Sequence, residues 1–251
     1  PNGVLFGKTA SVNVGGLVAS TLNIADADFM ANNYKFSGKE TGTVLNQGSI
    51  HAADGGYVAL LGANVSNQGV IAAKLGTVAL AAGKAMTLDV AGDKLLNIVV
   101  NQDVVNALVE NGGLIQANGG QVLMTTQTAG SLLANAVNNT GVIQAQTIQN
   151  VKGTIKLLAG MQNGSTLVAG TMDASAPTSG SGGFIETSAA KVSISDTAKI
   201  TTLASSGQTG TWLIDPQDFN VGDDPKTSNT SNISGAKLSD LLVTNSVIIR
   251  T

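Results

Sequence analysis

Residues 44–83, VLNQGSIHAADGGYVALLGANVSNQGVIAAKLGTVALAAG, contain one pattern twice. The segment 46–52 (NQGSIHA) matches 67–73 (NQGVIAA), and 56–60 (GYVAL) matches 76–80 (GTVAL). Each match follows its counterpart after roughly 20 residues. A period of this length, built from two short alternating strands with glycine between them, is typical of one coil of a β-solenoid. The stretch therefore predicts an all-β fold of stacked coils.

The same pattern continues along the chain and predicts β-helix coils over residues 44–210. The first half recurs from Asn111 and from Asn139, and a weaker copy begins at Gly170. The gap between Gly69 and Gly113 equals about two periods, which predicts one degenerate coil between residues 84 and 110. Alternation places one apolar set inside the coils: Val58, Leu60, Val78, Leu80, Val122, Met124, Ile155 and Leu157. We expect the recurring asparagines to form turn or stacked side-chain hydrogen bonds: Asn46, Asn67, Asn111 and Asn139.

The composition fits a narrow aliphatic core and excludes several classes of protein. Charged residues are 12% of the 251-residue chain and aromatic residues 3%, while glycine occurs 31 times and cysteine not at all. Typical globular domains carry about 25% charged residues. The net charge of −3 gives no basic patch, so we expect no nucleic-acid partner. No apolar run approaches the roughly 20 residues that a membrane-spanning helix needs.

Residues 1–43 form the first of the two segments that flank the coils. Within them, residues 25–42 gather charged residues and several of the chain's few aromatic rings. This composition predicts an elaboration outside the coil, whose rings cover an apolar surface. Within the coil region, residues 101–113 predict a short helix, with Asn101 as N-cap and a glycine stop.

Residues 211–251 form the second flanking segment, and we expect them to begin a following module. They hold the only tryptophan, Trp212, then a polar linker at 222–232 and an amphipathic helix at 234–242. That helix places three leucines on one side: Leu238, Leu241 and Leu242. Residues 247–249 predict a further strand. Because the chain begins at Pro1 without methionine, we expect it to be a fragment or a processed product.

The sequence predicts no catalytic residues, no metal site and no cofactor. The acidic residues between 44 and 200 share no template position, and a single histidine, His51, falls at an outward position of the alternation. Four aspartates near the C-terminus lack both EF-hand spacing and the calcium-binding solenoid repeat: Asp215, Asp218, Asp223 and Asp224. Trp212 is better interpreted as a packing anchor than as a platform for sugars.

Several blocks, taken in order, resemble a known family. PNGVLFG at the start, SVNVGGLVASTLNI, the repeat at 44–83 with its continuation KAMTLDVAGDKLL, and GTWLIDPQDFNV at 210–221 are similar to the two-partner secretion (TPS) domain of the filamentous haemagglutinin and high-molecular-weight adhesin family. That family's Asn-Pro-Asn-Gly motif is represented here by Pro1, Asn2 and Gly3, without its first asparagine. The resemblance implies a right-handed parallel β-helix.

The resemblance also implies a role in export. It implies a secretion domain and the proximal stalk of a large secreted adhesin, which reaches the cell surface through the periplasm. The implied partner is an outer-membrane TpsB-type transporter, whose periplasmic modules would contact Pro1, Asn2 and Gly3. A host-cell or surface receptor would bind regions outside this chain. Two alternatives stay open: a passive structural or biofilm-matrix solenoid, and, less favoured, a β-helical enzyme acting on polysaccharides.

Overall fold

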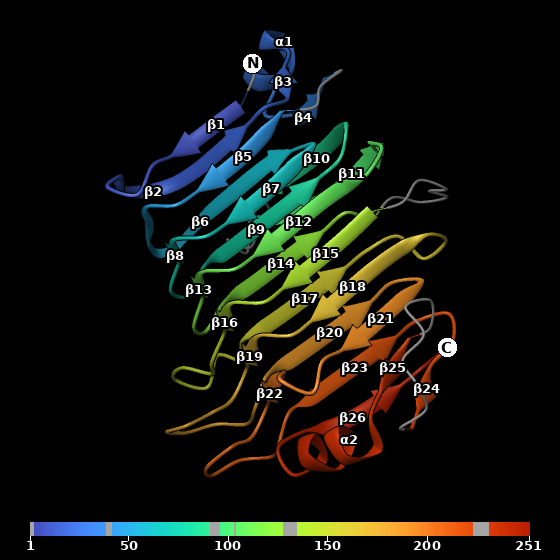
Figure 1. Ribbon diagram of the computed structural model, residues 1–251. Helices are drawn as coiled ribbons and strands as arrows, with labels where there is room; N and C mark the ends of the chain where they lie inside the picture. Colours follow the sequence, from blue (N-terminus) through green and yellow to red (C-terminus); the bar gives the residue numbers. More distant parts are fainter. Residues whose placement is uncertain (1–2, 39–41, 91–95, 103, 128–134, 223–230) are drawn as a thin grey trace.

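The computed structural model describes residues 3–38, 42–90, 96–102, 104–127, 135–222 and 231–251. Within them the chain winds into a stack of parallel strands, with one helical turn protruding at the N-terminal end and a second helix at the opposite end (Figure 1). The all-β, parallel β-helix architecture expected from the sequence is confirmed. No helix in these ranges is long and apolar enough to cross a bilayer.

One wall of the coil is a parallel sheet of short strands. In spatial order, the described part of this sheet consists of β1 (Gly3–Phe6), β5 (Thr43–Asn46), β7 (Asn64–Asn67), β12 (Ala107–Asn111), β15 (Asn135–Asn139), β18 (Gly164–Val168), β21 (Lys191–Ile194), β25 (Asn232–Ile233) and β24 (Asn220–Val221). From β5 to β25, each strand lies one turn of the coil after the strand before it. The last strand, β24, precedes its neighbour β25 in the sequence.

The other two walls belong to one continuous, bent sheet. Its long strands β2 (Ser11–Ser20) and β6 (Ser49–Gly62) run across both walls. One wall continues with β8 (Val70–Ala72), β13 (Leu114–Gln116), β16 (Val142–Gln144), β19 (Thr171–Asp173) and β22 (Lys199–Thr201). The other continues with β9 (Thr77–Ala82), β14 (Gln121–Thr125), β17 (Thr154–Leu158), β20 (Phe184–Ser188), β23 (Thr211–Asp215) and β26 (Ser246–Ile249).

The core is a set of apolar columns inside these walls, because equivalent residues of successive coils pair in register. Val58 lies beside Val78, which lies beside Val122. The eight residues that alternation places inside are all 0% exposed: Val58, Leu60, Val78, Leu80, Val122, Met124, Ile155 and Leu157. Burying a complete aliphatic side chain stabilises the folded state by about 1.5–3 kcal/mol. Trp212 continues the first column above Ile185 and is likewise fully buried, which confirms its role in packing.

Asparagines line one corner of the core, as expected. The Nδ2 group of Asn46 donates to Oδ1 of Asn67 at 2.8 Å, Asn67 to Asn111 at 2.8 Å, and Asn111 to Asn139 at 2.9 Å. All four are at most 1% exposed. We call these residues the asparagine ladder. It ends at Asn139, whose Nδ2 donates to the carbonyl oxygen of Thr171 instead.

A glycine lies two residues after each asparagine of the ladder, because the backbones of adjacent coils approach closely at this corner. A Cβ atom on Gly69 would collide with the carbonyl oxygen of Gly48, and one on Gly113 would collide with that of Gly69. The recurrence of Asn-x-Gly in the sequence therefore has a steric cause.

The helix predicted at residues 101–113 is wrong. Leu96–Gln102 is strand β11 and Ala107–Asn111 is strand β12. In β12 the side chains alternate, with Ala107, Val109 and Asn111 buried inside the coil. Pairing with β7 on one side and β15 on the other satisfies the β12 backbone and overrides the local helical pattern.

The degenerate coil expected between residues 84 and 110 is also absent from the described structure. Strand β12 pairs directly with β7, and β14 pairs directly with β9, so these coils are immediate neighbours. The intervening residues form an antiparallel pair, β10 (Ala85–Val90) and β11, outside the coil. The long interval between Gly69 and Gly113 in the sequence therefore reflects an insertion outside the coil and not a degenerate repeat.

The predicted elaboration at 25–42 is confirmed in its described part and joins that insertion. It contains α1 (Asp26–Met30) and β4 (Tyr34–Ser37), and it is preceded by β3 (Asn23–Ile24), which the prediction left out. With β10 and β11 these strands form an antiparallel sheet in the order β11-β10-β4-β3. We call it the outer sheet. Its buried side chains, among them Phe36 and Met86, pack on the outward-facing Ala59 and Ala79 of the coil.

The predicted coil bounds of 44 and 210 are wrong, because β1 and β2 pair with the coil before residue 44, and β23 and β26 continue its sheet after residue 210. The helix and strand predicted near the C-terminus are present. Helix α2 (Gly235–Leu242) begins at the N-cap Ser234, whose Oγ accepts from the Lys237 amide, and β26 follows it. Leu241 is buried and Leu238 packs on the core, but Leu242 is 53% exposed, because α2 covers the end of the coil with one narrow face only. Most of the predicted linker at 222–232 lies outside the described residues.

Candidate recognition surface

The predicted recognition triplet lies at the N-terminal edge of the coil. Pro1 and Asn2 are outside the described residues. Gly3 begins β1 and pairs with Thr43, the first residue of β5. A Cβ atom on Gly3 would come within 3.0 Å of the Thr43 carbonyl oxygen, so the two strands are in close contact there. The one described member of the triplet therefore lies in the first strand at this end of the stack.

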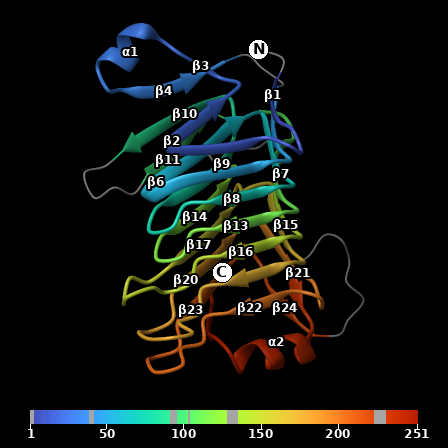
Figure 2. The same ribbon diagram turned by 90° about the vertical axis from the view of Figure 1, so that its left-hand side faces the viewer.

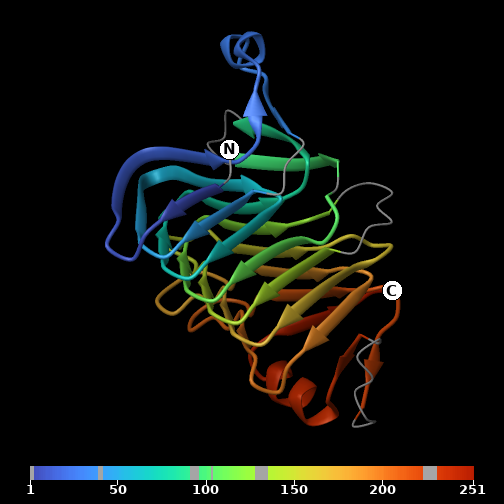
Figure 3. The ribbon, with the colours of Figure 1, turned by 45° about the horizontal axis from the view of Figure 1, so that its top comes forward.

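The elaboration stands out from the same end of the molecule. Figures 2 and 3 show α1 and its flanking strands β3 and β4 extending beyond the first coil. The Nδ2 group of Asn33 donates to Oδ1 of Asp28 at 2.8 Å and holds the turn after α1. The rings of Phe29 and Tyr34 meet edge to face, with centroids 6.1 Å apart. Phe29 and Met30 are nevertheless 56% and 80% exposed.

An apolar groove of about 430 Å³ lies between α1 and the coil. Its lining contains only apolar and aromatic side chains: Val18, Ile24, Phe29, Tyr34, Phe36, Tyr57 and Leu88. A Cβ atom on Gly16 would lie 2.8 Å from the Tyr57 ring, so glycine at that position leaves space for the ring. The combination of groove and exposed rings suits contact with another protein more than chemistry on a small molecule.

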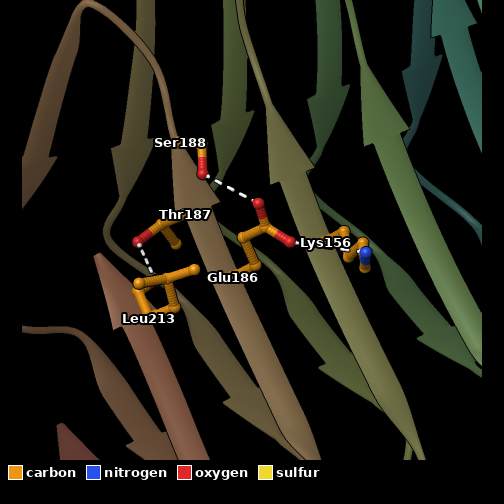
Figure 4. A network of polar contacts seen from close by, with 5 residues as sticks. All are labelled: Lys156, Glu186, Thr187, Ser188 and Leu213. Atoms are coloured by element: carbon orange, nitrogen blue, oxygen red, sulfur yellow. Dashed lines mark hydrogen bonds and ion pairs between the residues drawn. The ribbon is translucent and has the colours of Figure 1, made fainter. Parts of the chain in front are cut away.

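A polar cluster lies on the outward faces of β17 and β20. Lys156 of β17 pairs with Glu186 of β20 at 3.4 Å (Figure 4). The Ser188 hydroxyl donates to the other carboxylate oxygen of Glu186 at 3.1 Å, and the Lys156 ammonium lies 6.0 Å from the centre of the Phe184 ring. These side chains order the surface, and their partly exposed ion pair contributes little stability.

Groups that could perform chemistry are scattered over the described residues. His51 is exposed on β6 at the predicted outward position. Asp54 pairs with Lys74 at 2.9 Å on the surface. Across the described ranges, no three histidine or acidic side chains come close enough to hold a metal ion. The features that distinguish this surface are its shape, its apolar rings and its strand edges.

Sequence reasoning missed the β10–β11 pair and therefore missed most of the outer sheet. The available signal was apolar residues at alternate positions in two runs: Met86, Leu88 and Val90, then Leu96, Ile98 and Val100. Two alternating runs separated by a short break are typical of a hairpin.

A family model described as "TPS secretion domain" matches residues 1–168, about two thirds of the chain and all of the elements described at its N-terminal end. The chain belongs to this family. The TPS domain is a secretion domain, and this one is part of an exported exoprotein that passes through the periplasm to the cell surface.

Two relatives place this TPS domain among known proteins. A heme/hemopexin-binding protein of Haemophilus influenzae is 31% identical over 169 residues, which cover 63% of this chain and 18% of that protein. The crystal structure of the HMW1 secretion domain from Haemophilus influenzae matches with a TM-score of 0.72 and 24% identity, over 99% of this chain and 62% of that one. The chain therefore spans less than two thirds of each relative. The match to the solved structure shows the same fold.

Proposed function

We propose that this TPS domain is the segment by which its parent exoprotein is recognised in the periplasm, by the periplasmic modules of an outer-membrane TpsB-type transporter. The observation that carries the proposal is the match of the secretion-domain family over residues 1–168. The contact includes Pro1, Asn2 and Gly3. The exposed Phe29 and Met30 on the neighbouring elaboration support a protein contact at this end.

Co-precipitation of the chain with the soluble periplasmic part of its cognate transporter tests this proposal. We expect Asn2→Ala to weaken binding at least about tenfold, equivalent to 1.4 kcal/mol. The matched control is Asn13→Ala, the same substitution at an exposed position of the first coil. Gly3→Ala is a poorer test, because its methyl group would press on the Thr43 carbonyl. Equal retention of both asparagine variants would refute the role of the triplet, and no retention of the parent chain would refute the transporter contact.

For the parent protein we propose a non-enzymatic adhesin of the filamentous haemagglutinin type, displayed at the outer membrane. Its host-cell or surface receptor would bind regions outside residues 1–251. In this arrangement residues 1–43 and 44–210 form the secretion domain with its coils, and residues 211–251, whose strands β23 and β26 extend the same sheet, connect it to the rest of the parent protein. A cell-binding assay with the full-length protein distinguishes an adhesin from a passive stalk, which would not bind cells.

The stalk alternative is supported by the regularity of the coil. The apolar columns and the asparagine ladder are repetitive contacts that propagate along one axis, as a spacer requires. Loss of cell binding after deletion of regions beyond residue 251, with secretion unchanged, would favour the adhesin. Absence of binding by the full-length protein would favour the stalk.

A further inference from the structure

We propose that the free edge of β11 in the outer sheet is a docking site for an extended polypeptide segment of another protein, which adds to that sheet as a further strand. The proposal does not depend on the transporter contact, since a failure of the Asn2→Ala test would leave it intact. It is based on three features of the described structure: an unpaired strand edge, an apolar groove beside it and a coil surface that forms the floor.

Strand β11 is the last strand of the outer sheet. Within the described residues it pairs with β10 on one side only, in antiparallel register from Leu96 opposite Val90 to Val100 opposite Met86. In an antiparallel sheet the N–H and C=O groups of alternate residues of an edge strand point away from its partner. The Leu96 N–H already donates to Oγ1 of Thr77 at 3.4 Å. The groups of this kind that follow it along β11 are complementary to another extended backbone, and this determines the chemical class of the occupant.

A groove of about 310 Å³ runs beside this edge. One side is β11 itself, through Ile98, Val99 and Val100. The floor is formed by outward-facing side chains of the next coil strands, Leu123 of β14 and Leu158 of β17. Two polar residues, Thr125 and Gln127, complete the lining. An added strand would therefore place alternate side chains on leucine, and apolar residues are expected at those positions.

The exposure of β11 and the charges at the far rim of the groove indicate the polarity of the occupant. Val99 is 59% exposed, so the outer face of an added strand would continue a surface that faces solvent. Lys156 projects from the same face of β17 as Leu158 and pairs with Glu186 on the next strand, beyond the groove. This mixed pair gives the far rim no net charge, so an uncharged strand with alternating apolar and polar residues fits best.

The floor also argues against a second copy of the chain as the occupant. The coil strands β14 and β17 continue beyond the edge of β11, on the side of the outer sheet that faces the core. Antiparallel pairing of two β11 edges would put the second copy's coil on that same side, where the first copy's coil already lies. Within the part of the chain that the structure describes, a single extended segment meets no such obstacle.

The test uses the complete chain and an uncharged synthetic probe, acetyl-Gln-Val-Thr-Val-Thr-Val-Gln-amide, which presents three valines on one face. We expect binding by isothermal titration calorimetry, and protection of alternate β11 amides from hydrogen exchange by NMR. The control peptide has the same sequence with N-methyl groups on every valine and threonine, which removes those donors. Equal binding of the control peptide, or protection elsewhere without protection of β11, would overturn the proposal.

Variants of the floor provide the second measurement. We expect Leu158→Glu to weaken probe binding about tenfold or more, because a buried apolar contact is replaced by a charge. Leu167→Glu is the matched control: Leu167 is also a partly exposed, outward-facing leucine, but it lies on β18 in the other sheet. The milder Leu158→Thr covers the case in which the glutamate variant misfolds. Absence of binding up to about 1 mM probe, an equal response of both leucine positions, or a dimer paired through β11 in sedimentation would each overturn the proposal.

Discussion

The asparagine ladder carries polar groups through an otherwise apolar corner of the core. Each side chain in its interior both donates and accepts, so that no member is left with an unmet hydrogen bond along the column. Such satisfied polar columns are stable because the amides pair with one another, while an interrupted column leaves buried groups unpaired.

Asn67→Ala should therefore destabilise the fold by about 2–4 kcal/mol. The substitution leaves a donor on Asn46 and an acceptor on Asn111 without their ladder partner. Urea unfolding followed by circular dichroism measures the change. Gln68→Ala is the matched control: its bond with Gln47 is exposed, and its loss should cost within about 0.5 kcal/mol. Similar costs at both positions would contradict the interpretation.

Trp212 is the single tryptophan, so its fluorescence reports the unfolding of the last coils. Its ring is fully buried, and its Nε1–H donates to the Thr187 hydroxyl at 3.2 Å. Thr187→Val should cost about 1–3 kcal/mol, because the indole N–H is left buried without an acceptor. Unfolding followed by tryptophan fluorescence measures this, with Thr211→Val on the outward side of β23 as the control. An equal effect of the two substitutions would show that the indole hydrogen bond contributes nothing specific.

At the scale of elements, the outer sheet is a separate layer held on the coil by its own apolar contacts. Met86 and Leu96 point toward the coil and are each 1% exposed, while Thr87 lies between its neighbours on the solvent side. The coil strands beneath pair with one another independently of this layer. Loss of the layer is therefore expected to leave the coil intact.

Met86→Lys should detach the β10–β11 pair while the coil persists. A lysine ammonium cannot be buried against alanines without a partner, and the local cost exceeds about 3 kcal/mol. We expect limited proteolysis to cut within residues 84–106, with far-UV circular dichroism still showing β structure. Thr87→Lys should leave the protease pattern unchanged. Global unfolding of the Met86 variant would contradict the independence of the two layers.

Strand β12 of the coil shows where reasoning from sequence fails. Residues 101–113 have a capping asparagine and apolar spacing typical of a helix, yet Ala107–Asn111 is a strand. The positions of β7 and β15 on either side decide this, because they offer a complete set of backbone partners. Neither partner is visible from local propensity.

At the scale of the whole molecule, stability is the sum of contacts between adjacent coils. The chain can therefore fold coil by coil, and we propose that such folding at the cell surface opposes backward movement during export. The regular columns through Val58, Leu60, Val78 and Leu80 are the basis for this hypothesis. The side chains of these four residues are fully buried.

Leu80→Asp should strongly reduce secretion of the full-length protein, because a buried carboxylate interrupts the column between Leu60 and Met124. Immunoblotting of culture supernatant against cell extract measures the secreted fraction. His51→Asp, at an exposed position of the neighbouring coil, should secrete normally. Normal secretion of the Leu80 variant would refute coil-by-coil folding as a contributor to export.

The recurring glycines, the alternating aliphatic residues and the asparagines of four successive coils were sufficient by themselves to determine the solenoid, its inward residues and its polar ladder. They suffice because each coil contacts only its neighbours, so that the relevant interactions repeat in the sequence. The fate of residues 84–110 and the assembly of the outer sheet were decided only by the tertiary structure. Strand β4 pairs with β10 across about 50 residues of chain, and an antiparallel contact of that range leaves no periodic trace in the sequence.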